Sequence, residues 1–187
     1  MDINVNDPAY MQHIGAQEGR DPKRLVMLMA LSKYLEEELG DISVFRGRMV
    51  LTKDDPKTLI TILDNPDPDR YPRAAGRFGD SAETYNEDYV LLLQGWTVDD
   101  KVNPSDPAHR FMARTVAALN KLVRRAGPNE KPLDGDNVYL LGGLITRLSV
   151  EPGVVRPPAE QLSEDAFFWL RVAVGFTDNP NDPFDLS

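Results

Sequence analysis

The fold of this chain is decided by residues 141–180, LGGLITRLSVEPGVVRPPAEQLSEDAFFWLRVAVGFTDNP. This segment contains two strand-like runs, Leu144–Val150 and Phe167–Phe176, on either side of a rigid corner at Arg156-Pro157-Pro158. Successive side chains of a strand point to opposite faces of a sheet. In the second run, one face receives Phe168, Leu170, Val172, Val174 and Phe176, and the other receives Phe167, Trp169, Arg171 and Ala173. The pattern predicts two paired strands and offers no residue set suited to catalysis.

Composition is typical of one globular domain. The chain has 187 residues, of which 41% are hydrophobic, so it is long enough to bury a sizeable core. Its 15 prolines and 13 glycines predict long connections between regular elements. No run approaches the roughly 20 apolar residues of a membrane-spanning helix. The start, MDINVNDPAY, is acidic where a secretory signal is basic and then apolar. We therefore expect no membrane association and no cleaved signal.

The chain is acidic and contains no cysteine. Its 30 acidic residues outnumber 21 basic ones, which gives a net charge of −9. Such a charge disfavours a phosphate-binding surface over the whole chain and favours protein partners. The absence of cysteine excludes disulfides, thiolate nucleophiles and cysteine-based zinc sites.

Two helices are predicted, each with a proline near its start. Residues 1–20 show no sustained period and are expected to form an amino-terminal arm. A first helix begins at Asp21-Pro22 and ends at Gly40, and its residues at helical spacing are Leu25, Leu28, Ser32, Leu35 and Leu39. A second helix begins at Ser105-Asp106-Pro107 and ends before Gly127-Pro128. Its apolar stripe consists of Phe111, Met112, Thr115, Val116, Leu119, Leu122 and Val123.

Three strands are predicted between the helices, at Ser43–Thr52, Thr58–Leu63 and Tyr89–Val98. The third is apolar on both faces and is therefore the best candidate for a central strand. Residues 64–88 form a long loop with seven acids and three arginines. Loops of this length are usually functional or disordered. We favour partner contact over a solvated flap for this loop.

The order of elements is helix, three strands, helix and two strands. Consecutive strands without an intervening helix can pair as antiparallel hairpins, and two apolar helices need one sheet face to cover. The sequence thus predicts an α+β fold, with a four- or five-stranded, mainly antiparallel sheet and both helices packed on one face. Residues 21–178 would form a single domain, and residues 179–187 a carboxy-terminal tail.

No residue pattern typical of an active site occurs. The two histidines, His13 and His109, have no second histidine at helical ligand spacing, so both are interpreted as surface residues. The doublets Asp54-Asp55 and Asp99-Asp100 could supply paired carboxylates for acid–base chemistry or Mg²⁺, but turn formation explains them better. The glycine-rich phosphate loop and the nucleophile elbow are both missing from the sequence. We expect no catalytic residue, no metal site and no cofactor.

Local charged clusters are the candidate contacts with other chains. Lys121, Arg124 and Arg125 lie at the end of the second helix, and we expect such clusters to meet carboxylates of a neighbouring subunit rather than DNA. Glu36, Glu37 and Glu38 end the first helix and are expected to face solvent or a basic partner. The candidate interface residues are Arg46 and Arg48 on one strand face, Arg70, Arg73 and Arg77 in the long loop, Arg156 at the proline corner, and Trp169.

Several segments resemble the tail terminator, or tail-completion, proteins of tailed bacteriophages. They are Arg46-Gly47-Arg48 with the following Asp55-Pro56 and LITILDNP; Tyr89 to Asn103-Pro104-Ser105-Asp106-Pro107-Ala108; and Arg156-Pro157-Pro158 through Phe167-Phe168-Trp169-Leu170. The resemblance covers roughly residues 21–178. It consists of composition and order of segments rather than a catalytic signature.

The resemblance implies a structural virion protein with no enzymatic activity and no cofactor. Such a protein is a subunit of a hexameric ring that caps the head-proximal end of the tail tube, stops its polymerisation and joins the tail to the neck. The implied partners are further copies of the chain, the tail tube protein, a neck, connector or stopper protein and, in a contractile tail, a sheath protein. Genomic DNA would pass through the lumen without specific binding, which is compatible with a net charge of −9. The implied location is the tail–neck junction of the virion, after assembly in the host cytoplasm.

Other functions stay open. Another neck or adaptor protein, of head-completion or stopper type, would share these fold-level features. A small-ligand or peptide-binding domain is a further alternative, and behind it a hydrolase with carboxylates from the Asp-rich loops. In a ring, exposed edges of the strands Leu144–Val150 and Phe167–Phe176 could extend sheet pairing between subunits, unless the chain covers these edges itself. The 64–88 loop would then reach the tube or a neighbouring subunit.

Overall fold

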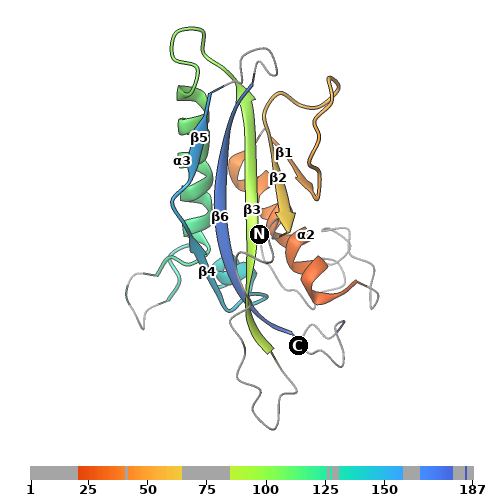
Figure 1. Ribbon diagram of the computed structural model, residues 1–187. Helices are drawn as coiled ribbons and strands as arrows, with labels where there is room; N and C mark the ends of the chain where they lie inside the picture. Colours follow the sequence, from red (N-terminus) through yellow and green to blue (C-terminus); the bar gives the residue numbers. More distant parts are fainter. Residues whose placement is uncertain are drawn as a thin grey trace.

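The computed structural model describes residues 21–40, 42–64, 85–125, 127, 131–157, 165–178 and 184, without the side chains of residues 85–88, 176 and 178 (Figure 1). Across these ranges the chain forms two α-helices and a mixed sheet of six strands. This confirms the α+β class, with a sheet somewhat larger than expected. The elements are α2 (Lys23–Leu39), β1 (Ser43–Arg46), β2 (Leu59–Asp64), β3 (Tyr85–Val98), α3 (Asp106–Lys121), the 3-10 helix η1 (Tyr139–Leu141), β4 (Arg147–Val150), β5 (Val154–Arg156) and β6 (Asp165–Asp178).

Two long strands, β3 and β6, form the centre of the sheet. They pair antiparallel over all 14 residues of each, from Tyr85 opposite Asp178 to Val98 opposite Asp165. The strand order is β1-β2-β3-β6-β4, and β5 also pairs with β6. The predicted long loop is therefore shorter than residues 64–88, because Asp64 belongs to β2 and residues 85–88 belong to β3. Its remaining part lies outside the described residues, as do the predicted arm at 1–20 and most of the tail at 179–187.

The strand predicted at Ser43–Thr52 ends early, at Arg46. Gly47 has φ +69°, a left-handed conformation that glycine adopts without steric cost, and here it turns the chain out of the strand. The connection then returns along the sheet, where the Thr61 hydroxyl donates a hydrogen bond of 2.7 Å to the carbonyl of Arg48. Because the chain returns before β2 begins, β1 and β2 are parallel. The expectation that consecutive strands pair as hairpins is wrong at this point.

The strand predicted at Leu144–Val150 is also shorter, and a strand that was not predicted follows it. The chain passes from β4 through Pro152 and Gly153 into β5, and both strands pair with β6. The rigid corner therefore begins only after Arg156, the last residue of β5. As a result β6 has neighbours on both sides and is not an edge strand. The hypothesis that β6 extends sheet pairing between subunits is wrong.

Both described sheet edges are poor templates for strand addition. The edge formed by β4 and β5 is interrupted by Pro152, which lacks an N–H, and by Gly153. At the other edge, the Glu36 carboxylate accepts the backbone N–H of Val44 at 3.0 Å. Short, interrupted or capped strands are the usual protection against edge-to-edge association.

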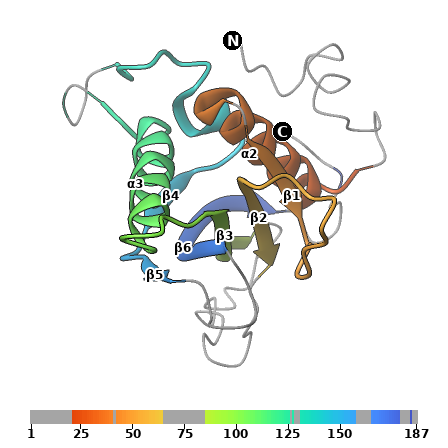
Figure 2. The ribbon, with the colours of Figure 1, turned by 90° about the horizontal axis from the view of Figure 1, so that it is seen from above.

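Both helices cover the same face of the sheet (Figure 2), as predicted. The side chains of this inner face form the core: Val44, Ile60, Ile62, Leu91, Leu93, Phe168, Leu170, Val172 and Val174. Phe168 lies over Gly95, its partner in the β3–β6 register, and Phe111 of α3 meets its ring edge-on at 5.3 Å. Burial of each such side chain contributes roughly 1.5–3 kcal/mol before entropic costs. This contact is where α3 is anchored on the sheet.

Helix α2 is buried on more sides than its predicted stripe implies. Val26, Met27 and Leu31 lie outside that stripe, yet each is at most 1% exposed. The segment after α3 passes beside α2 (Figure 2), and its Leu141, Leu144 and Ile145 belong to the same buried cluster. Because α2 is covered on several sides, its buried residues extend beyond one stripe, and the predicted stripe is not a guide to its packing. The helix also begins one residue later than expected, with Pro22 at the N-cap.

Candidate subunit and partner interface

The face of the sheet that points away from the helices, here called the outer face, carries many apolar side chains among polar ones such as Gln94, Arg171 and Asp165. Directly opposed residues of an antiparallel pair share a face, and the face alternates along each strand. The register therefore places these residues on the outer face: Val90, Leu92, Trp96 and Val98 of β3, Phe167, Trp169 and Ala173 of β6, and Val154 of β5. A solvated face of an antiparallel sheet normally carries polar side chains at these positions. Apolar side chains gathered on an exposed sheet face are typical of a contact surface.

Three aromatic rings on this face, Trp96, Phe167 and Trp169, form what we call the aromatic cluster. The ring centroids lie 4.9 Å apart for Trp96 and Phe167, and 5.6 Å apart for Phe167 and Trp169. Trp169 is 40% exposed, and its cross-strand neighbour Val154 is 46% exposed. The cluster thus combines fixed ring packing with apolar surface open to solvent.

Arginines border the aromatic cluster. Arg156 is exposed and lies directly opposite Phe167, whereas Arg147 is opposite Gly175, away from the cluster. Arg171 pairs with Glu151 at 2.7 Å, next to the break between β4 and β5. Among the described residues, none forms an ion pair with Arg156.

Among the predicted interface residues that the structure describes, it brings two together and separates them from Arg46 and Arg48. Arg156 and Trp169 share the outer face. Arg46 is exposed at the end of β1, but Arg48 lies beyond the strand, where it pairs with Asp55 at 2.7 Å and stacks over the ring of Phe45 at 4.8 Å. The prediction that Arg46 and Arg48 share a strand face is therefore wrong, because the strand ends between them. Arg70, Arg73 and Arg77 lie outside the described residues.

Sequence reasoning missed Trp96, Phe167 and Val154 as members of this surface. The alternation within β6 did place Phe167 with Trp169, and that part of the prediction is confirmed. Trp96 and Val154 join them only through the pairing of β6 with β3 and β5. A tryptophan near the end of a predicted strand was the available signal, but its strand partner could not be read from the sequence.

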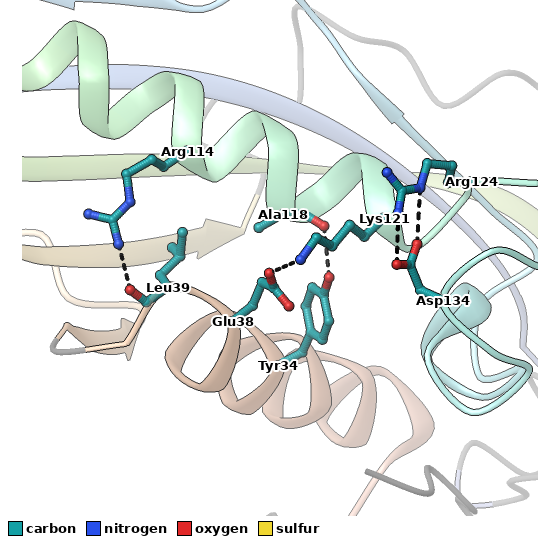
Figure 3. A network of polar contacts seen from close by, with 8 residues as sticks. All are labelled: Tyr34, Glu38, Leu39, Arg114, Ala118, Lys121, Arg124 and Asp134. Carbon is teal, nitrogen blue, oxygen red and sulfur yellow. Dashed lines mark hydrogen bonds and ion pairs between the residues drawn. The ribbon is translucent and has the colours of Figure 1, made fainter.

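The basic cluster at the end of α3 binds groups of its own chain (Figure 3). Lys121 pairs with Glu38 of α2, and Arg124 pairs with Asp134 at 2.8 Å. Arg125 stacks over the ring of Tyr139 at 4.3 Å. These contacts give the three residues a role within the fold, and their expected contact with a neighbouring subunit stays a prediction. Glu38 is exposed as expected, but its basic partner belongs to the same chain.

Two further contacts join α2 to α3 (Figure 3). The Tyr34 hydroxyl donates to the carbonyl of Ala118 at 2.8 Å, and Arg114 donates to the carbonyl of Leu39 at 2.6 Å. Burial raises the pKa of the Tyr34 hydroxyl well above its ordinary value. Tyr34 is therefore a neutral donor that holds the helices together.

The acidic doublets stabilise turns, as the sequence indicated. Asp55 accepts the N–H of Thr52 at 2.6 Å, and Asp100 accepts the N–H groups of Val102 and Asn103 at 2.8 Å each. These hydrogen bonds to the charged form lower the pKa of both carboxyls. His109 is exposed on α3, and His13 lies outside the described residues. In the described part of the chain, no group of three histidines and carboxylates is placed to hold a metal ion, and no helix is long and apolar enough to span a membrane.

Comparison with known proteins does not assign the chain to a family, since neither a family model nor a curated protein matches it. A function for the chain can therefore be proposed only from the surface chemistry of the described residues and from the resemblance of segments within residues 21–178 to tail terminator proteins.

Proposed function

We propose that this chain is a structural virion protein of a tailed bacteriophage, a tail terminator. In this role it is a subunit of a ring that caps the head-proximal end of the tail tube, stops tube polymerisation and joins the tail to the neck. It acts without catalysis and without a cofactor.

The observation that carries the proposal is the apolar outer face with its aromatic cluster. A protein that works by assembly needs such a surface, whereas an enzyme needs a convergent set of reactive groups. The carboxylates considered for chemistry, Asp55 and Asp100, are engaged in turns. The basic groups Lys121 and Arg124 are engaged between elements of the fold. The polar groups named above thus stabilise the fold, while apolar side chains stay exposed on the outer face. Exposed apolar surface of this kind supports a role in assembly.

Net charge supports the same proposal. At −9 the chain repels DNA in general, which suits a ring through which DNA passes without binding. A neck or adaptor protein of the same virion would also have an acidic net charge and an exposed apolar face. The terminator and adaptor functions therefore differ in the partner bound, which is the tail tube for a terminator.

The experiment mixes the purified chain with the tail tube protein of the same virus while tubes polymerise, and measures tube lengths by electron microscopy. We expect tube length to become limited as the chain is added, with one ring at a single tube end. The tube protein alone serves as the control for unlimited growth. Unlimited tubes in the presence of the folded chain would contradict the terminator function. Binding to connectors but not to tubes would instead indicate a stopper or adaptor.

A further inference from the structure

We infer that residues 140–145, here called the strap, are a conformational device of the fold. The strap is a strained turn that opens as a unit, so that its apolar side chains leave the core while the sheet and both α-helices stay folded. The inference concerns the chain by itself and does not depend on the proposed function.

Four successive residues of the strap have a left-handed backbone. The φ angles are 53° at Leu140, 55° at Leu141, 68° at Gly142 and 91° at Gly143. Glycine adopts such angles without steric cost, whereas the Cβ atom of a leucine comes too close to the following carbonyl oxygen. Leu140 and Leu141 are the only non-glycine residues with a positive φ in the described part of the chain. Strained residues of this kind cluster at clamps and switch regions of proteins.

The backbone of the strap is tied to the rest of the molecule only at its two ends. The N–H of Leu140 donates to the carbonyl of Leu122, at the end of α3, at 2.7 Å. Just beyond the strap, the N–H of Thr146 donates to the carbonyl of Gly175 in β6, also at 2.7 Å. Between these anchors, and among the described residues, the N–H groups of residues 141–145 donate only to carbonyls of residues 138–141. The strap can therefore move between its anchors without breaking a backbone hydrogen bond to another element.

Burial of apolar side chains holds the strap closed. Leu141, Leu144 and Ile145 are each at most 3% exposed, and they belong to the same buried cluster as the residues of α2, beside which the strap passes (Figure 2). Hydrophobic attraction has no preferred direction, so it does not fix the strap as a hydrogen-bonded ladder would. Opening loses the burial of three side chains but recovers the strain at two leucines. It therefore costs less free energy than unfolding of the whole core.

The absence of cysteine from the sequence allows a direct measurement of opening, because one introduced thiol is the only reactive group of its kind. Leu144→Cys places that thiol on the strap. Val172→Cys, in the central part of β6, is the matched control, since Val172 is also buried, at 0% exposed. For each full-length variant we would follow thiol labelling by a chromogenic aromatic disulfide at increasing urea concentrations. Circular dichroism would give the global unfolding of the same variant.

We expect the two thiols to react by different routes. Labelling of Val172→Cys should follow global unfolding and accelerate steeply with urea, because global unfolding exposes a large surface. Labelling of Leu144→Cys should be roughly tenfold or more faster than its own global unfolding allows, with a weak dependence on urea, as is typical of local opening.

The role of strain is tested by Leu140→Gly and Leu140→Ala, each combined with Leu144→Cys. The two substitutions differ by one methyl group, but only glycine accepts the φ of 53° without strain. At an ordinary position glycine would loosen the chain and speed up labelling. Here we expect Leu140→Gly to be labelled roughly threefold or more slowly than Leu140→Ala, because it stabilises the closed strap.

Three outcomes would overturn the inference. Labelling of Leu144→Cys only at the rate of its global unfolding would show that the strap is a fixed part of the core. Labelling of Leu140→Gly as fast as that of Leu140→Ala, or faster, would show that strain does not drive the opening. If Leu144→Cys does not fold, amide exchange of the wild-type chain gives the same comparison. Protection at Gly143 and Ile145 equal to that of β6 would then contradict the inference.

Discussion

At the scale of single residues, Gly95 controls how the two long strands meet α3. It lies opposite Phe168 in the β3–β6 register, and the phenyl ring occupies the space that a side chain at Gly95 would need. A Cβ atom at this position would lie 2.1 Å from the nearest ring atom of Phe168. The same ring is also in edge-on contact with Phe111. The ring therefore has little freedom to move away.

We predict that Gly95→Ala lowers the free energy of unfolding by about 1–3 kcal/mol, the usual cost of overpacking a core. Urea denaturation followed by circular dichroism measures this change as a lower transition midpoint. The test of its cause is the double variant Gly95→Ala with Phe168→Leu. Because the smaller leucine leaves room for the new methyl group, the double variant should lose less stability than the sum of the two single changes. Strict additivity would show that the clash is not the reason.

At the scale of elements, α2 and α3 are held together by polar contacts above a shared apolar core. The contacts come from residues far apart in the chain, such as Lys121 and Glu38, which are separated by 83 positions. The Tyr34 hydroxyl is the most deeply placed of them, since Tyr34 is only 8% exposed. The exposed ion pairs contribute little, because solvent screens them, whereas a buried hydrogen bond contributes more.

We predict that Tyr34→Phe lowers the free energy of unfolding by about 1 kcal/mol at pH 7. The difference from wild type should then narrow as the pH rises above about 10, the ordinary pKa of tyrosine. The pKa of Tyr34 is raised in the folded state, so its contribution is complete below the unfolded-state value and is lost as the pH increases. Urea denaturation at pH 7 and at several values above pH 10 measures both effects. A difference that stays constant with pH would contradict this role of the hydroxyl.

At the scale of the whole molecule, the central position of β6 determines which strands of the sheet unfold locally and which unfold only with the whole domain. Its neighbours are β3 on one side and β4 with β5 on the other, so its backbone groups are paired in both directions. The outer strands β1 and β5 have only four and three residues and one neighbour each. Stability within a domain is usually lowest at such short outer elements.

We predict that amide hydrogen exchange is slowest in the part of β6 from Phe168 to Val174 and in the part of β3 paired with it. Exchange there should require global unfolding, whereas β1 and β5 should exchange through local opening. Exchange measured residue by residue by nuclear magnetic resonance distinguishes these classes. Fast exchange at alternate residues of β6 would mean that one of its edges is open, as the sequence alone had suggested.

The sequence by itself determined the features that depend on local periodicity and composition. The helix after Ser105, the alternation of apolar and outer residues in β6, the α+β class and the use of the aspartate doublets in turns were all predicted correctly. These features follow from residues a few positions apart, so their physical cause is contained in short segments.

Only the tertiary structure decided which elements are neighbours. The parallel pairing of β1 and β2, the strand β5, the central place of β6 and the engagement of Lys121 with Glu38 all depend on contacts between distant segments. The aromatic cluster is the clearest case, because Trp96 and Phe167 come from strands on either side of α3 in the chain. The side-chain period places each ring on a face of its own strand, but it carries no information about which strand lies beside it. That choice is made by packing of the whole core.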